Sequence, residues 1–213
     1  MKGVFITGTD TGVGKTYFTA LLTRSLRKQD ISAIPLKPIS SGDREDAIRL
    51  SEATRGEISP AEINPVHLSA PLSPYAACML EGRPFPWGIL REKMQQITVA
   101  YPGPFLVEGA GGWRTPLDPT HSIREWAQEL ALPVIVVARA GLGTLNHTLL
   151  TIDSIHQSGL PVLGIVLNEN GTPTDDATRT NPALLTELTQ KPVLILEEGA
   201  TGLQIPDWLG FSI

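Results

Sequence analysis

Four segments in the later part of this chain are apolar throughout instead of alternating between apolar and polar residues. They span residues 105–107, 134–137, 162–167 and 193–196. Strands of this kind are buried on both faces, which is typical of a parallel sheet with both sides covered. Helical patterns separate them, near residues 123–130, 145–157 and 182–189. The alternation predicts a three-layer α/β fold, in which helices flank a mostly parallel sheet.

The N-terminal part of the chain follows the same pattern. An apolar run at residues 4–6 leads into a glycine-bearing turn and then a helical pattern over 15–28, which has one apolar face. A second strand, over 31–36, is stopped by Pro38. Acidic residues at the start of the next segment predict a short helix over 43–54.

Residues 60–101 are less regular and rich in proline. We expect a helical insertion there, because Leu90, Met94 and Ile97 would share one face of a helix. The sequence has no internal repeat and no low-complexity linker. We therefore expect a single domain over residues 1–213.

The charge balance limits the classes of partner. With 22 Asp and Glu against 17 Lys and Arg, the formal net charge is −5, so we expect no nucleic acid binding by a general basic surface. The single cysteine, Cys78, cannot form an internal disulfide, and the first residues do not form a signal segment. The longest apolar runs are far shorter than the ~20 residues that cross a bilayer. We expect a cytoplasmic protein without a membrane span.

The strongest chemical signal is the run Gly-Thr-Asp-Thr-Gly-Val-Gly-Lys-Thr at residues 8–16, between a predicted strand and a predicted helix. Backbone N–H groups of such a turn and the following helix N-terminus bind phosphate oxygens. Lys15 would reach the β- and γ-phosphates, and the Thr16 hydroxyl would ligate Mg²⁺. The strict pattern requires glycine at Thr9, so this is a variant of the phosphate loop. The alternative is a plain strand-to-helix turn with an incidental lysine.

Polar residues follow three other predicted strands, at the edge of the sheet where ligands bind in open parallel sheets. Glu108 ends one strand before a glycine-rich turn and could hold Mg²⁺. Lys37 and Asn168 follow two others, and Asn168 is placed to contact adenine. Strand-end lysines and acids are also often solvated, asparagine is common in turns, and Asp46 could merely complement a helix dipole.

Other residues carry no comparable signal. The four histidines lack metal-ligand spacing, and nothing near Cys78 suggests a nucleophile with its base. The sequence Asn168-Glu169-Asn170-Gly171 is not the guanine-reading Asn-Lys-x-Asp, so GTP specificity is not indicated.

Taken together, these motifs resemble the dethiobiotin synthetase family, ATP-dependent enzymes of biotin biosynthesis with a fold of the P-loop NTPase type. The resemblance runs nearly end to end and is carried by residues 7–16, Lys37-Pro38, Ser41-Gly42, 71–74, 107–112, 141–147 and Asn168. It implies carboxylation and ring closure of 7,8-diaminononanoate with CO₂, through a carbamate and a carbamic–phosphoric anhydride, to give dethiobiotin, ADP and phosphate. It also implies ATP as co-substrate, Mg²⁺ as cofactor and a homodimer.

The resemblance further implies a role for individual residues. Lys15 and Lys37 would be catalytic, and Mg²⁺ would be held by Thr16, Asp46 and Glu108. Substrate contacts would come from Thr11, Lys37, Ser41, Leu142, Gly143, Thr144 and Asn146, the last four in a loop at the dimer interface. ATP would be bound by Gly12, Val13, Gly14, Lys15, Thr16, Tyr17, Asp46, Glu108, Gly109, Ala110, Gly111, Asn168, Pro206 and Asp207.

The C-terminal segment departs from the family pattern. Family members commonly have a short Gly-Glu-Ile-Pro run there, whereas this chain has a longer stretch over 195–204 before Pro206. We therefore formulate the hypothesis of a relaxed base preference, with CTP or GTP partly accepted.

Two other functions are compatible with a phosphate loop on such a sheet. A switch ATPase of the partition or cell-division type generally has a second lysine early in the loop, where this chain has Thr9, Asp10 and Thr11. A related amidoligase-like ATPase acting on a larger carboxylate is the second alternative. Because fold alone does not decide between these functions, an assay with the expected substrates is needed.

Overall fold

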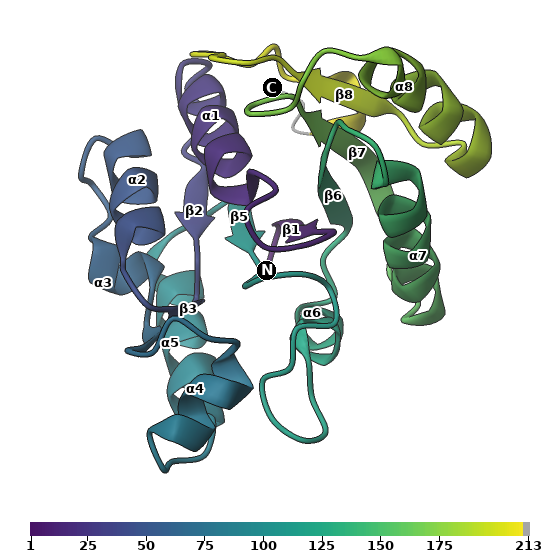
Figure 1. Ribbon diagram of the computed structural model, residues 1–213. Helices are drawn as coiled ribbons and strands as arrows, with labels where there is room; N and C mark the ends of the chain where they lie inside the picture. Colours follow the sequence, from purple (N-terminus) through teal and green to yellow (C-terminus); the bar gives the residue numbers. More distant parts are fainter. Residues whose placement is uncertain (211–213) are drawn as a thin grey trace.

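The computed structural model describes residues 1–210, and its centre is a six-stranded sheet (Figure 1). All strand pairings in this sheet are parallel, and the strand order is β2-β5-β1-β6-β7-β8. The strands are β1 (Gly3–Gly8), β2 (Ile34–Leu36), β5 (Phe105–Glu108), β6 (Val134–Arg139), β7 (Val162–Asn168) and β8 (Val193–Leu196). The predicted parallel sheet is confirmed.

Both faces of the sheet are buried, as the apolar strands predict, except at the edge strand β8, where Ile195 is 43% exposed. Val4 and Ile6 of β1 belong to a core cluster that includes α1 (Lys15–Arg27) and the segment at 200–209. Phe5, between them, points to the opposite face and belongs to the second core cluster. Helices that contribute to this second cluster include α5 (Trp87–Ala100), α6 (Ile123–Leu130), α7 (Thr144–Gln157) and α8 (Asp176–Thr189). The expected three layers are therefore present.

Residues 37–101 form a group of elements beside β2, all of them short except α5 (Figure 1). They include a two-stranded parallel sheet that the sequence patterns did not predict, because strands of three residues are too short to show a period. The face of α5 with Leu90, Met94 and Ile97 is buried, as predicted. The other elements are β3 (Ile39–Ser41), α2 (Glu45–Ala53), α3 (Pro60–Ile63), β4 (Val66–Leu68) and α4 (Pro74–Leu80).

The largest boundary error concerns α8, which we predicted over 182–189 and which begins at Asp176. A capping box explains the earlier start: the Asp175 side chain accepts a hydrogen bond from Thr178 N at 2.9 Å, and the Thr178 hydroxyl oxygen accepts one from Asp175 N at 2.8 Å. Pro182 therefore lies inside the helix instead of starting it.

The last described element is the short 3-10 helix η1 (Asp207–Leu209). No helix within residues 1–210 is both long enough and apolar enough to cross a membrane.

Candidate active site

The predicted site residues that end or follow strands of the central sheet lie along one edge of it. Because all its strands run in the same direction, their carboxyl ends meet at this edge. The phosphate loop follows β1, Lys37 follows β2, and Glu108 and Asn168 end β5 and β7. In the strand order, Lys37 and Glu108 lie on one side of the phosphate loop and Asn168 lies on the other.

The phosphate loop has the conformation that anion binding requires. Gly12 and Gly14 have positive φ angles of 72° and 98°, which favour glycine. Gly14 is the N-cap residue of α1 and makes no side-chain cap, so the first N–H groups of the helix are not covered by a side chain. Lys15 curls back over the loop and donates a hydrogen bond to the backbone oxygen of Asp10 at 3.0 Å. This arrangement suits a phosphate group.

A buried network of charged and polar groups borders the loop. The Lys37 ammonium lies 2.7 Å from Asp46 Oδ2 and 2.5 Å from Glu108 Oε1. The same Glu108 oxygen accepts a hydrogen bond from the Thr16 hydroxyl at 2.8 Å. Glu108 is fully buried, and Lys15, Thr16 and Lys37 are each less than 10% exposed. Residues from the ends of β2 and β5, from the first turn of α1 and from α2 thus converge on one point.

The network shifts the pKa values of its members in opposite directions. Burial alone would lower the pKa of Lys37, but the carboxylates of Glu108 and Asp46 raise it above its ordinary value. Burial would raise the pKa of Asp46, but its contacts with Lys37 lower it. Burial and the neighbouring Lys37 charge lower the pKa of Lys15 to about 8. Lys37 is therefore kept in its charged form. The charged form of Lys15, in contrast, is destabilised unless an anion binds beside it.

The oxygen atoms of Thr16, Asp46 and Glu108 are hard ligands of the kind that Mg²⁺ prefers. The Lys37 ammonium already lies on the two carboxylates, so the position suits a cation. The second carboxylate oxygen of Glu108 is buried and has no hydrogen-bond partner within the described chain. This set of residues therefore fits the expected metal ion.

Next to Thr11 lies a cavity of about 360 Å³ that suits part of a substrate. Its lining combines phosphate-loop residues with the buried Trp113 and with Leu150 of α7, which is 61% exposed. Ser41, at the end of β3, has a buried hydroxyl without a partner among residues 1–210. A buried hydroxyl without a partner calls for an explanation, and a ligand contact at this predicted substrate position would supply one.

The loop before α7 lies beside the phosphate loop. Thr9, Arg139, Leu142 and Thr144 line a shared cavity of about 320 Å³. Gly143 is the N-cap residue of α7, and Leu142 is 93% exposed. Asn146 lies in the first turn of α7 and is exposed.

Arg139 was missed by the sequence analysis. It ends β6, and its guanidinium lies 3.6 Å from Asp10 Oδ2 in the phosphate loop. The sequence feature that points to Arg139 is the one that pointed to Lys37: a cationic residue at the end of an apolar strand.

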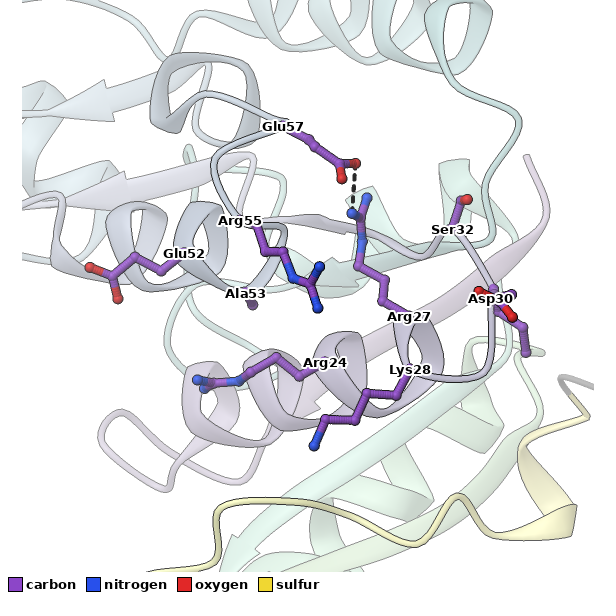
Figure 2. A pocket seen from close by; sticks show the side chains of 10 residues that line it. Arg24, Arg27, Lys28, Asp30, Ser32, Glu52, Ala53, Arg55 and Glu57 are labelled. Carbon is purple, nitrogen blue, oxygen red and sulfur yellow. Dashed lines mark hydrogen bonds and ion pairs between the residues drawn. The ribbon is translucent and has the colours of Figure 1, made fainter.

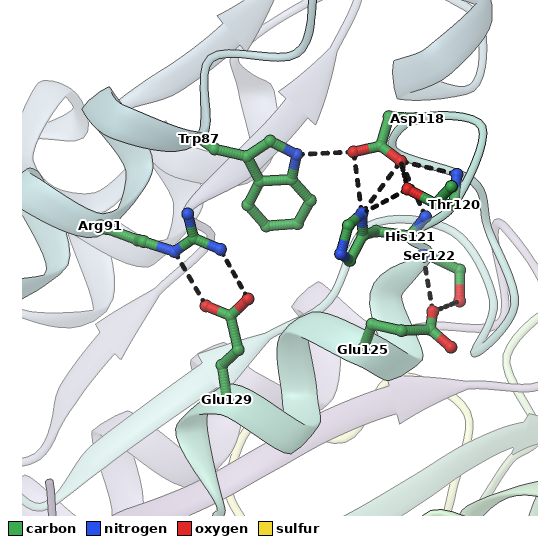
Figure 3. Close-up of polar contacts among 8 residues, drawn as sticks. All are labelled: Trp87, Arg91, Asp118, Thr120, His121, Ser122, Glu125 and Glu129. Carbon is green, nitrogen blue, oxygen red and sulfur yellow. Dashed lines mark hydrogen bonds and ion pairs between the residues drawn. The ribbon is translucent and has the colours of Figure 1, made fainter.

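The glycine-rich turn after Glu108 is held by the segment that follows it. Gly112 N donates to the Thr115 hydroxyl oxygen at 2.8 Å, and further along Asp118 accepts a hydrogen bond from Trp87 Nε1 of α5 at 2.7 Å (Figure 3). Partial burial would raise the pKa of Asp118, but hydrogen bonds from Thr120, Trp87 and His121 hold it well below its usual range. Gly109, Ala110 and Gly111 lie between the Glu108 carboxylate and this anchored segment.

Asn168 contacts the other end of the phosphate loop, where its amide nitrogen donates to Val13 O at 3.1 Å. The C-terminal segment approaches there through residues 199–200, and the Tyr17 hydroxyl donates to Ala200 O. Pro206 and Asp207 lie farther along, next to Trp208, whose ring packs against Gly164 in the middle of β7. Within residues 1–210, no hydrogen bond or ion pair joins Pro206 or Asp207 to the phosphate loop.

A separate cavity of about 350 Å³ lies at the opposite end of α1 (Figure 2). Arg24, Arg27, Lys28 and Arg55 line it, together with acidic residues such as Glu57, which pairs with Arg27 at 2.7 Å. None of the predicted site residues lines this cavity. It is not part of the candidate active site.

Solved structures support the fold. The signal recognition particle receptor FtsY from Elizabethkingia anophelis matches with a TM-score of 0.58 at 13% identity, over 99% of this chain and 63% of that chain. A putative plasmid partition protein from Borrelia burgdorferi, solved with AMPPNP, matches with a TM-score of 0.53 at 12% identity, over 98% of this chain and 93% of that one. At these identities the likeness shows the fold alone.

Sequence comparisons are more specific. A family model described as an AAA domain matches residues 2–196. ATP-dependent dethiobiotin synthetase BioD from Anaeromyxobacter dehalogenans (strain 2CP-C) is 42% identical over 201 residues, which cover 92% of this chain and 89% of the relative. The protein of the same name from Aquifex aeolicus (strain VF5) is 42% identical over 189 residues, covering 87% and 84%. The chain therefore belongs to the ATP-dependent dethiobiotin synthetase family.

Proposed function

We propose that this protein is a dethiobiotin synthetase, which uses ATP to carboxylate 7,8-diaminononanoate with CO₂ and to close the product into a cyclic urea. The observation that carries this proposal is the contact of Lys37 with Asp46 and Glu108 beside the phosphate loop. Family membership and the order of the motifs along the chain support the same activity.

The reaction accumulates negative charge on oxygen. One amine of the substrate attacks CO₂ and loses a proton, which gives a carbamate. A carbamate oxygen attacks the γ-phosphorus of ATP, and ADP leaves. The second amine then attacks the carbonyl carbon of the mixed anhydride, phosphate leaves, and a second proton is lost as the ring closes.

The two lysines suit the charged steps. We assign to Lys37 the stabilisation of the carbamate and of the transferring phosphoryl group, since its ammonium is buried and held charged. Lys15 lies over the phosphate loop. There the β- and γ-phosphates would stabilise the charged form of Lys15, which burial disfavours. Preorganised charges in a buried site act without the reorganisation that solvent requires.

Mg²⁺ would be held by Thr16, Asp46 and Glu108, and when bound it would neutralise charge on the β- and γ-phosphates. The Lys37 ammonium lies on both carboxylates, so this position already holds a cation. The unpaired oxygen of Glu108 leaves a further ligand atom for the metal.

The cavity beside Thr11 supports binding of an aliphatic diamine, because Trp113 and Leu150 add two apolar side chains to its otherwise mostly polar lining. We assign Thr11 and Ser41 to the reacting end of the substrate. Residues 142–146 would bind the substrate carboxylate across the interface of a homodimer, through the N-terminus of α7. We place the reaction in a reducing cytoplasm, with which the buried, unpaired Cys78 agrees.

The decisive experiment measures phosphate release and dethiobiotin formation with purified protein. We expect phosphate release only when MgATP, diaminononanoate and bicarbonate are all present, and a product with the mass of dethiobiotin. A switch ATPase would release phosphate without the diamine, and an amidoligase-like enzyme would not form the cyclic urea. Either result would exclude the proposal.

A further inference from the structure

The segment that carries Lys37 and Ser41 is held along its length by residues 63–68. At one end Lys37 N donates a hydrogen bond to Ile63 O at 3.0 Å. From there the parallel pairing of β3 with β4 continues as far as Ser41 and Leu68. The position of the Lys37 backbone therefore depends on residues that lie far from it in the sequence.

The centre of this contact is the side chain of Asn64, which is 1% exposed. Its amide nitrogen donates to the backbone oxygen of Lys37 at 2.8 Å and to that of Val66 at 3.3 Å. Its amide oxygen accepts a hydrogen bond from the Ser40 hydroxyl at 2.9 Å. One buried amide thus joins the end of β2 to both strands of the small sheet.

The partners of Asn64 allow only one orientation of its amide. The backbone oxygens of Lys37 and Val66 only accept, so both require the amide nitrogen. A flipped amide would place its oxygen against these two oxygens and would lose both hydrogen bonds. Because the side chain is buried, water does not replace them, so the contact holds the Lys37 backbone in one position.

The same contact sets the direction of Ser41. Successive side chains of a strand point to opposite faces. Since the Ser40 hydroxyl is turned toward Asn64, the Ser41 side chain is turned away from it. The Ser41 hydroxyl is buried there and has no partner among residues 1–210, which leaves it for a ligand.

We propose that Asn64 is the positioning residue for Lys37 in the dethiobiotin synthetase reaction. The Lys37 ammonium meets two carboxylates at once, Glu108 Oε1 at 2.5 Å and Asp46 Oδ2 at 2.7 Å, so its place depends on where its backbone lies. A displacement of about 1 Å in a reaction site costs on the order of 10²-fold in rate. The proposal rests on the proposed function, which gives Lys37 its role in the reaction.

Asn64→Ala tests the proposal by separating kcat from KM. We expect kcat for dethiobiotin formation to fall about 10- to 100-fold, because the Lys37 backbone loses its contact. KM for MgATP should stay within about threefold of the parent value, since the hydrogen bonds of the Asn64 side chain within residues 1–210 do not reach the phosphate loop. A normal kcat, or a loss confined to KM for MgATP, would overturn the proposal.

A double-mutant cycle with Lys37→Ala shows whether Asn64 acts through Lys37. In the Lys37→Ala background, Asn64→Ala should lower kcat by less than about threefold. The matched control is Asn181→Ala, because Asn181 is 4% exposed and its amide also donates to two backbone oxygens, those of Ala140 and Gly141, at 2.8 Å and 3.2 Å. Its effect on kcat should be the same in both backgrounds. Additive effects of Asn64→Ala, or equal coupling for Asn181→Ala, would mean that the coupling is not specific to Asn64 and would overturn the proposal.

Asn64→Asp is a second test, which keeps the shape of the side chain. A protonated carboxyl group can still donate to the Lys37 oxygen, whereas an ionised one only accepts and would face two backbone oxygens. The kcat of this variant, divided by that of the parent at the same pH, should therefore rise at least about fivefold from about pH 8.5 to about pH 6. A constant ratio would overturn the proposal, even if Asn64→Ala does not fold.

The parent enzyme distinguishes the failure of this inference from the failure of the proposed function. If the parent forms no dethiobiotin from MgATP, diaminononanoate and bicarbonate, the proposed function is wrong. If the parent forms dethiobiotin and the folded Asn64 variants keep its kcat, only the role of Asn64 is wrong.

Discussion

The ammonium nitrogen of Lys37 lies 2.5 Å from Oε1 of Glu108, whose side chain is completely buried. A buried ion pair contributes little net stability, because the cost of removing two charges from water offsets their attraction. Removing one partner is far worse, since it leaves a buried charge without compensation. This ion pair is therefore better explained by a role in the reaction than by a contribution to the stability of the fold.

Replacing Lys37 with alanine should have two effects. Product formation should fall on the order of 10²-fold or more, because the charge that stabilises the transferring phosphoryl group is lost. Stability should also fall by about 3 kcal/mol, because Glu108 is left buried and unpaired. Steady-state kinetics and urea unfolding check the two effects separately.

The double variant Lys37→Met with Glu108→Gln is the matched control for this pair. It should recover most of the lost stability, since the fully buried Glu108 charge is removed together with its partner and Asp46 is partly exposed to solvent, but it should not recover turnover. Near-normal turnover in Lys37→Ala would contradict the assignment of Lys37 as a catalytic residue.

Lys15 should make stability depend on pH. Its pKa is about 8 in the folded protein against an ordinary value of 10.5, so between these pH values the unfolded chain binds more protons. Stability then rises with pH across this range, and below about pH 8 the full cost of the buried charge remains. Without nucleotide at pH 7, Lys15→Met should therefore be more stable than the parent, by on the order of 1–2 kcal/mol.

Urea unfolding at several pH values tests this prediction. The advantage of Lys15→Met should disappear as the pH approaches 10.5, while MgATP should stabilise the parent protein and not the variant. If the parent and Lys15→Met had the same stability at every pH, the buried Lys15 charge would not destabilise the protein in the absence of nucleotide.

Alanine substitutions at two glycines of the phosphate loop distinguish the cost of backbone strain from the cost of a steric clash. Gly12 and Gly14 both have positive φ, so alanine at either position costs about 1 kcal/mol or more. A Cβ atom at Gly12 would meet no atom within 4 Å, whereas at Gly14 it would lie 2.2 Å from the Asn168 nitrogen. Gly14→Ala should therefore destabilise the protein clearly more than Gly12→Ala in thermal unfolding without nucleotide, and equal losses would contradict the packing of Asn168.

The sequence predicts the central fold well because its strands are uniformly apolar and its helices periodic. The short pair β3 and β4 escaped prediction because three residues show no period, and Asp175 and Thr178 start α8 through a side-chain cap that hydrophobic periodicity does not reveal.

The candidate site was partly predictable for a topological reason. Residues at the ends of parallel strands meet at one edge in any strand order, so Lys37, Glu108 and Asn168 could be chosen from the sequence. Contacts between side chains depend on the strand order, in which β1 lies between β5 and β6. The pairing of Arg139 with Asp10 follows from this order and was therefore out of reach.

Asp118 should stabilise the segment that follows the glycine-rich turn. Its carboxylate accepts hydrogen bonds from Trp87 Nε1, from the backbone and hydroxyl of Thr120 and from His121 N (Figure 3). We expect Asp118→Asn to lower stability at pH 7 by about 1–2 kcal/mol, because the amide has only one oxygen to accept these bonds.

The effect of Asp118→Asn should depend on pH in a defined direction. Because the folded pKa of Asp118 lies below its ordinary value of 3.8, its contribution is complete above about pH 4 and is lost as the pH falls further. The stability difference between the parent and Asp118→Asn should therefore be constant from pH 5 to 8 and shrink in more acidic solution. Arg91→Ala, which removes the exposed ion pair with Glu129 at 2.7 Å, is the control and should cost less than about 1 kcal/mol. A difference that is already lost at pH 6, or a larger effect of Arg91→Ala, would mean that the Asp118 carboxylate does not anchor this segment.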